Sequence, residues 1–188
     1  MSEKGSKAGL PVLLFAEAAG FESWLESQGK TTAGAWLLFA KKDSNAVSLS
    51  RQEAIDAALC KGWIDGQAAT WDDRFFLIRF TPRRSRALWS QINVERAEEL
   101  IAEGRMRDAG LAQVVAARSD GRWAAAYPPS STAVPPPDLQ AALDRDQAAA
   151  ERFAAMRKSD RYALILALTN MRRAENRQRR IDAFLESE

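Results

Sequence analysis

Residues 58–66 read Ala-Leu-Cys-Lys-Gly-Trp-Ile-Asp-Gly, and this stretch predicts a helix end followed directly by the start of a buried strand. The helix begins upstream at Ser50, because Ser50 and Glu53 have the S-x-x-E spacing of a capping box. Gly62 has no β-carbon and can adopt the left-handed conformation that ends many helices. We therefore expect Trp63 to open a strand and to fill the core.

The strands expected from apolar runs and alternation are confined to the first half of the chain. In residues 75–81, Phe76, Ile78 and Phe80 alternate with other side chains, which predicts a strand with one buried face. The full set of expected strands is residues 11–15, 35–40, 63–70 and 75–81. Helix signals mark residues 21–28, 50–62, 93–104 and 107–118, with Asn93 as the N-cap of the third helix. Residues 1–9 are expected to be disordered.

Residues 128–137 read Pro-Pro-Ser-Ser-Thr-Ala-Val-Pro-Pro-Pro and are predicted to be an extended linker, because consecutive prolines favour polyproline geometry. The chain beyond this linker carries helical patterns at residues 139–143, 148–156, 162–171 and 175–185. Such short helices are marginal alone, so we expect them to pack on one another or on the preceding domain.

These elements predict an α+β fold, because strands lie in the first half of the chain and helices dominate the second. We expect a small, mostly antiparallel sheet of three or four strands covered by helices, with an all-helical C-terminal subdomain. The expected boundaries are an α+β domain at 10–127, the proline-rich linker at 128–137 and the helical subdomain at 138–188.

The composition excludes several classes of functional site. The 188 residues include no histidine and one cysteine, Cys60, which excludes histidine-based triads, Cys–His pairs and intramolecular disulfides. We expect no metal site and no cofactor, and we interpret Cys60 as an inert core thiol. The net charge is only +2, so no nucleic-acid partner is expected. The arginine-rich tail at 172–180 is interpreted as a packed helix, with Arg177 beside its apolar face.

The N-terminal region is interpreted as part of the folded protein. Lys4 and Lys7 precede an apolar run at residues 10–16, but Glu17 interrupts this run before the core of a signal peptide develops. No segment approaches the roughly 18 apolar residues of a membrane span. We therefore expect a cytoplasmic protein without a membrane span.

Several motifs follow one another at characteristic separations: residues 58–66, 80–84, 89–93, 104–106, and Arg177 with Arg180-Ile181. Over residues 11–184 the pattern resembles the bacterial YdeI/OmpD-associated family, often labelled bacteriocin-protection proteins. The resemblance implies this fold and a role in stress or resistance. Relatives often have phenylalanine at the position of Lys61, serine near Ala87 and a histidine at Gln28-Gly29. These departures leave open a changed function within the family.

The candidate binding site combines aromatic and arginine side chains. Arg83 and Arg84 follow a strand, and planar cations of this kind suit an anionic or flat ligand, the alternative being a solvated surface. Asp65 either caps a backbone amide, pairs with Arg83 or a cationic ligand, or acts as an acid or base. Asn93 is either a helix cap or a ligand contact. The expected cleft is lined by Trp63, Asp65, Arg83, Arg84, Trp89 and Asn93.

The sequence and the resemblance together suggest a cytoplasmic stress- or resistance-associated protein. It is expected to bind a small molecule or a protein partner in this cleft. The alternative is a histidine-independent enzyme that acts on a small specialised metabolite. In that case Asp65 is the expected catalytic carboxylate, with Lys61 assisting by its charge or, if buried enough, by amine chemistry.

Overall fold

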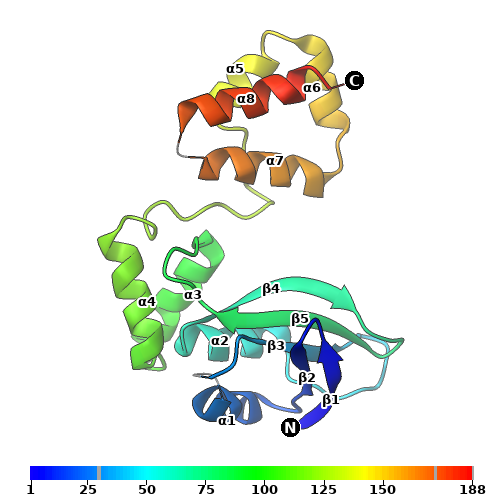
Figure 1. The fold of residues 1–188 in the computed structure, drawn as a ribbon, viewed down its shortest axis with the longest axis vertical. Coiled ribbons are helices and arrows are strands. Elements are labelled where there is room, and N and C mark those ends of the chain that lie inside the picture. The colour runs from blue at the N-terminus through cyan, green and yellow to red at the C-terminus, as the bar shows by residue number, and fades with distance from the viewer. Residues whose placement is uncertain (29–30, 172, 188) are drawn as a thin grey trace. The chain divides into compact units, whose positions relative to one another are not determined.

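In the computed structural model, which describes residues 1–28, 31–171 and 173–187, the chain forms two compact units (Figure 1). The first, here called the sheet unit, comprises Met1–Trp89 and Asn93–Ala125; the second, the helical unit, comprises Ser90–Ile92 and Ala126–Glu188. The predicted α+β class with a helical C-terminal part is confirmed. Gly29, Arg172 and Glu188, which fall within the ranges named above, lie outside the described ranges.

The sheet has five strands in the order β1-β2-β3-β5-β4. They are β1 (Ser2–Lys7), β2 (Leu10–Leu14), β3 (Ala35–Ala40), β4 (Trp63–Thr70) and β5 (Phe75–Pro82). Neighbouring strands are antiparallel except β2 and β3, which are parallel. The prediction of a mostly antiparallel sheet is therefore confirmed, although the sheet is larger than the three or four strands expected.

The strand that the sequence did not predict is β1, which lies in the segment expected to be disordered. Its backbone pairs with β2, with Ser2 opposite Leu14 and Lys7 opposite Leu10. The prediction was wrong because β1 is a polar strand at the edge of the sheet. Such a strand has no apolar alternation that would reveal it.

The predicted helices are all present, with ends displaced by up to about one turn. The sheet unit carries α1 (Ala18–Gln28), α2 (Arg51–Cys60), most of α3 (Gln91–Ala102), and α4 (Asp108–Ser119). The helical unit carries α5 (Pro137–Leu143), α6 (Gln147–Ala155), α7 (Lys158–Asn170) and α8 (Ala174–Leu185). Pro137, which the sequence placed in the linker, is the first residue of α5, where its missing N–H group is not needed.

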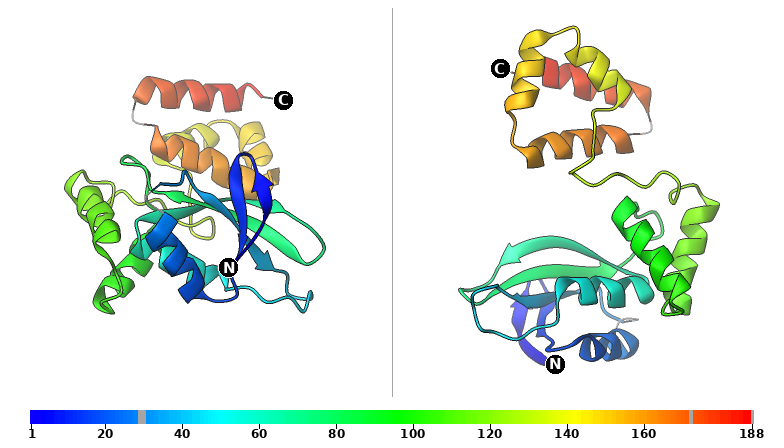
Figure 2. Two further views of the ribbon diagram at one scale, coloured as in Figure 1. Left: turned by 60° about the horizontal axis from the view of Figure 1, so that its bottom comes forward. Right: turned by 180° about the vertical axis from the view of Figure 1, so that it is seen from behind.

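Apolar side chains cover both faces of the sheet. Ile78 and Phe80 of β5 are buried in the cluster that includes side chains of α1 and α2, and both helices lie on one face of the sheet (Figures 1 and 2). On the opposite face Leu77 and Trp36 are also buried, so the expectation of one buried face was wrong. The Trp36 indole N–H donates to the carbonyl of Lys7 at 3.1 Å, so the β1–β2 hairpin contributes to covering that face.

Helix α2 begins as the sequence predicted. The Ser50 hydroxyl accepts from the Glu53 N–H at 3.2 Å, and the Glu53 carboxylate accepts from the Ser50 N–H at 2.7 Å, which completes the capping box. Asn93, in contrast, is not the N-cap of α3 but lies inside its first turn. The helix begins at Gln91, directly after Ser90, another residue type that favours helix starts.

A buried ion pair connects α2 with α3. The carboxylate of Asp56 accepts from Arg96 Nε at 2.8 Å and from Arg96 Nη2 at 2.6 Å. It also accepts from the side chain of Gln52 at 2.8 Å, and a guanidinium nitrogen of Arg105 lies 3.6 Å away. The Asp56 side chain is only 8% exposed, so these partners replace the water that solvates a surface carboxylate.

We expect acid to destabilise the sheet unit through Asp56. Burial alone would raise the pKa of this carboxyl group, but hydrogen bonds from Arg96 and Gln52 and the charges of Arg96 and Arg105 lower it below its ordinary 3.8. A lowered pKa contributes stability that is present above the unfolded-state pKa and is lost as the pH falls through the folded-state pKa. The urea midpoint, followed by tryptophan fluorescence, should therefore fall below about pH 5. Asp56→Asn should reduce the change of the urea midpoint with pH. An equal change in the variant and the unchanged protein would contradict the prediction.

The helical unit has its own core and its own half-buried ion pair. Leu139, Leu143, Ala149, Leu164, Leu168 and Ile181 form the core. Arg177 of α8 donates to both carboxylate oxygens of Asp138, at 2.8 and 2.7 Å, and to the carbonyl of Leu168 at 2.8 Å. It thereby connects α8 with the start of α5 and the end of α7. The interpretation of Arg177 as a packing residue is confirmed.

Candidate functional site

The residues of the predicted cleft do not line one cavity. Trp63 and Arg83 line a pocket of the sheet unit, and Arg84 lines a different, smaller one. Asp65 and Trp89 line neither of these two pockets, and Asn93 lies in the first turn of α3. The structure therefore separates side chains that the sequence grouped by proximity along the chain.

Trp63 and Trp89 are core residues, with 4% and 2% of their surface exposed. The Trp63 ring packs edge-on against Trp24, with ring centroids 5.7 Å apart. The Trp89 ring contacts Trp123, with ring centroids 4.7 Å apart, and the Arg83 guanidinium lies 3.7 Å from the Trp89 ring centroid. Trp89 thus holds the Arg83 side chain in position through a cation–π contact.

Asp65 pairs with Arg51 at 3.2 Å rather than with Arg83. Arg51 is the first residue of α2 and its side chain is 62% exposed, so this is a surface ion pair with a small contribution to stability. The contact connects β4 with the start of α2. Among the residues that the structure describes, the ion-pair contact of Asp65 is with the Arg51 side chain.

The pocket that contains Trp63 and Arg83, here called the Lys61 pocket, has a volume of about 530 Å³. Its apolar wall includes Leu25, Trp63 and Pro82. Its polar wall consists of Glu26, Lys61, Arg83, Arg107, Asp108 and Gln113. These residues come from the end of α1, the α2–β4 junction, the end of β5 and the start of α4, which the chain brings together around one opening.

Two glycines allow the helices around the Lys61 pocket to approach closely. A β-carbon on Gly62, whose φ is 74°, would lie 2.8 Å from the carbonyl oxygen of Ala109. A β-carbon on Gly110 would lie 2.6 Å from the carbonyl oxygens of Leu59 and Cys60. The end of α2 and the first turn of α4 are therefore in backbone contact, and this contact brings Lys61 and Arg107 to the same pocket.

The electrostatics of the Lys61 pocket centre on one short ion pair. The ammonium group of Lys61 donates to the Glu26 carboxylate at 2.5 Å. The hydrogen bond and charge of Lys61, with a smaller effect of Arg107, lower the pKa of Glu26. Arg107 is also the N-cap of α4 and gives it no side-chain cap hydrogen bond. The Lys61 pocket therefore combines three cationic side chains, two carboxylates and the positive end of the α4 helix dipole.

The second pocket of the predicted region has a volume of about 220 Å³ and is lined by both Arg79 and Arg84. It lies beside an irregularity between Asp65 and Ala68 in the pairing of β4 with β5. The Nε of Arg79 is buried and has no hydrogen-bond partner among the described residues. The volume is below the range of about 300–1,000 Å³ typical of ligand sites.

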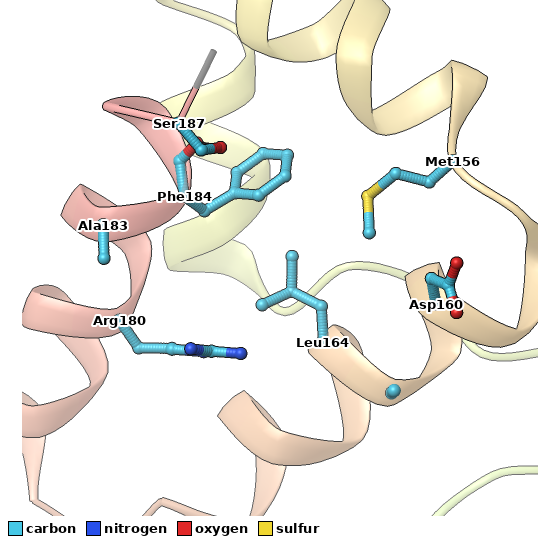
Figure 3. Close-up of a pocket in the computed structure, with 8 residues that line it drawn as sticks. Met156, Asp160, Leu164, Arg180, Ala183, Phe184 and Ser187 are labelled. Carbon is cyan, nitrogen blue, oxygen red and sulfur yellow. Dashed lines mark hydrogen bonds between the residues drawn. The ribbon is translucent and has the colours of Figure 1, made fainter.

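The helical unit has a pocket of about 400 Å³ between α7 and α8 (Figure 3). Leu164 and Phe184 point into it, with Met156 beside them at the end of α6. Arg180 and Asp160 lie on different sides of this opening. Its two charged residues therefore have opposite signs, and its lining is otherwise mainly apolar.

The described residues contain no group of three or more histidine, cysteine, aspartate or glutamate side chains that could hold a metal ion. In the same ranges, no helix has the length and apolar character needed to cross a membrane. Cys60 is buried, and burial raises the pKa of its thiol, consistent with the predicted core position.

Sequence reasoning noted Lys61 but missed Glu26, Arg107 and Gln113. Glu26 and Lys61 are 35 positions apart, so no local motif joins them. The available signal was the start of α4, where Arg107 directly precedes a helix that has Gly110 in its first turn. A glycine in that position indicates a close helix contact and therefore a neighbouring element.

Two family models match separate parts of the chain. Residues 13–113 match a domain of unknown function (DUF8412), and residues 132–187 match the model described as Bacteriocin-protection, YdeI or OmpD-Associated. No curated protein and no solved structure matches the chain. The resemblance to the YdeI/OmpD-associated family is confirmed for residues 132–187. The motifs at 58–66, 80–84 and 89–93 lie within the other model, as do all the residues of the Lys61 pocket.

Proposed function

The chain belongs to the family of the domain of unknown function DUF8412, and from this premise we propose that it binds a small anionic molecule in the Lys61 pocket. We further propose that it acts in the cytoplasm in stress or resistance. The match of residues 132–187 to the bacteriocin-protection model supports the association with resistance. The family of residues 13–113 brings no activity with it, so the proposed ligand rests on the chemistry of the pocket.

The observation that carries this proposal is that Lys61 and Arg107 line one pocket beside an apolar wall. The buried Arg83, which donates to the carbonyl of Leu88, is a third cation of this pocket. Guanidinium groups bind carboxylate and phosphate through paired N–H donors, and an ammonium group adds a point charge. The first turn of α4 lacks a side-chain cap, and a helix N-terminus favours negative charge. These groups together suit a carboxylate or phosphate.

The rest of the pocket favours a ligand with a flat or apolar part. Trp63, Pro82 and Leu25 line one side, and the volume of about 530 Å³ is typical of a site for a small molecule. The Glu26 carboxylate pairs with Lys61, and the Glu26 side chain is 63% exposed. An incoming anion can therefore displace this carboxylate into water and take its place on Lys61.

We expect Lys61→Gln and Arg107→Gln each to weaken the binding of an anionic ligand about tenfold, because each removes a charge-assisted hydrogen bond. Glu26→Gln should tighten binding, because it removes the competing carboxylate. Thermal-shift screening of small carboxylates and phosphates, aromatic ones included, identifies the ligand. Titrations followed by tryptophan fluorescence then measure each dissociation constant, with Trp63 as a reporter in the pocket wall.

Arg51→Gln is the matched control, because Arg51 pairs with Asp65 and does not line the Lys61 pocket. Its dissociation constant should equal that of the unchanged protein. The proposal is refuted if Arg51→Gln weakens the binding of the ligand while Lys61→Gln and Arg107→Gln bind it with full affinity. The binding site would then lie outside the Lys61 pocket.

A further inference from the structure

A second pocket of the helical unit lies between the proline-rich segment and α7, and its volume is about 300 Å³. Ser130 and Ser131 come from the proline-rich segment, whereas Lys158, Arg161 and Tyr162 belong to the first turns of α7. The segment at 128–137, which the sequence predicted to be an extended linker, therefore forms a pocket wall.

We propose that this pocket, here called the Lys158 pocket, binds a small organic oxyanion, a phosphomonoester or a carboxylate, with its apolar part against Phe153 and Ile165. This site is separate from the Lys61 pocket, and neither proposal depends on the other.

The charge of the lining residues carries the inference. Lys158 and Arg161 are both cations, and no carboxylate belongs to the described lining of the Lys158 pocket. In the pocket between α7 and α8, by contrast, Arg180 is accompanied by Asp160. A hydrogen bond of 3.2 Å from Arg161 Nη1 to the carbonyl of Ala154 fixes one end of the guanidinium group at the end of α6. This bond occupies one terminal nitrogen of a group that carries five N–H donors.

Tyr162 fixes the wall of the pocket without adding negative charge. Its hydroxyl donates to the carbonyl of Pro128 at 3.0 Å, which holds the proline-rich segment against α7. Burial, and to a smaller extent the proximity of Tyr127, raises the pKa of Tyr162, so the phenol stays neutral at physiological pH. The nearest acid in sequence, Asp160, is bound to Arg157 at 2.7 Å and does not line this pocket.

The position of the cations supports the same conclusion. Lys158 is the first residue of α7 and Arg161 lies in its first turn, where the helix dipole disfavours positive charge. A bound oxyanion would offset this repulsion, and the hydroxyl groups of Ser130 and Ser131 could donate to it. The volume is at the low end for ligand sites, so a single ring or a short chain fits but a large ligand does not.

The test uses the full chain and two probes that share one ring, phenyl phosphate and benzoate. Each is titrated against isotope-labelled protein while the amide signals of Ser130, Ser131 and Lys158 are followed by NMR. We expect saturable shifts at these signals with at least one probe, and the responding probe identifies the phosphate or carboxylate class. Benzyl alcohol, which keeps the ring but lacks the charge, should give no saturable shift.

Lys158→Gln should weaken the binding of the responding probe about tenfold, because it removes a charged donor. Arg161→Gln should weaken the binding of this probe to a similar extent. Lys158→Gln is the variant that disturbs the fold less, because Arg161 also bonds to α6. Arg180→Gln, which lines the neighbouring pocket, is the matched control and should not change the affinity. Saturation by neither probe at the three amides, or equal affinity in the folded Lys158→Gln variant, would overturn the proposal.

Discussion

Replacing Arg96 by methionine is expected to lower the free energy of unfolding of the sheet unit by about 3 kcal/mol. The variant keeps an apolar stem of similar length but removes the two N–H groups that bind the Asp56 carboxylate at 2.8 and 2.6 Å. Asp56 remains buried, with Arg105 at 3.6 Å as its nearest remaining cation. A buried carboxylate that has lost its main partner accounts for most of the expected loss.

The measurement is urea unfolding followed by tryptophan fluorescence. All six tryptophans of the chain lie in the sheet unit, so this signal does not report directly on the helical unit. The double variant Arg96→Met/Asp56→Leu should recover much of the loss, because an apolar pair replaces both charges. Arg51→Met, which breaks the exposed pair with Asp65, should cost less than about 1 kcal/mol. A loss below about 1 kcal/mol in Arg96→Met would show that this ion pair is not a main support of the fold.

The fold could be predicted from the sequence where local signals decide it. The capping box of Ser50 and Glu53 fixed the start of α2, and the left-handed Gly62 marked its end. Strand β1 could not be predicted, because its polar residues become a strand only through pairing with β2. Similarly, the alternation in β5 indicated one buried face, whereas the burial of Leu77 depends on packing on the second face of the sheet.

The site was less predictable, because its contacts join distant parts of the chain. Trp63 and Arg83 were expected to reach the cleft and do line the Lys61 pocket. Asp65 was grouped with them by sequence proximity, but it lies two residues further along β4 and pairs with Arg51 at the start of α2. Glu26 and Arg107 join the pocket only because α1 and α4 pack beside the end of α2. No pattern within a short window contains that information.

Gly110→Ala is expected to destabilise the sheet unit by about 2–3 kcal/mol. Alanine ordinarily stabilises a helix relative to glycine by about 1 kcal/mol, so helix propensity alone predicts the opposite sign. The new β-carbon would lie 2.6 Å from the carbonyl oxygens of Leu59 and Cys60 and 2.8 Å from the Met106 methyl carbon. Two of these neighbours are backbone atoms at the end of α2, so relief requires the two helices to separate rather than one side chain to rotate.

Gly20→Ala in α1 provides the matched control for this change. Its β-carbon would meet only the Phe15 ring at 3.3 Å among the described residues, so the stability should stay within about 1 kcal/mol of the unchanged protein. Gly110→Ala should also weaken binding at the Lys61 pocket, since Gly62 and Ala109 face each other across the same helix contact and both line that pocket. Urea unfolding and the ligand titration test these two consequences separately. If Gly110→Ala proves as stable as Gly20→Ala, the end of α2 can move away from α4 at little cost, and the pocket between them is not rigidly preformed.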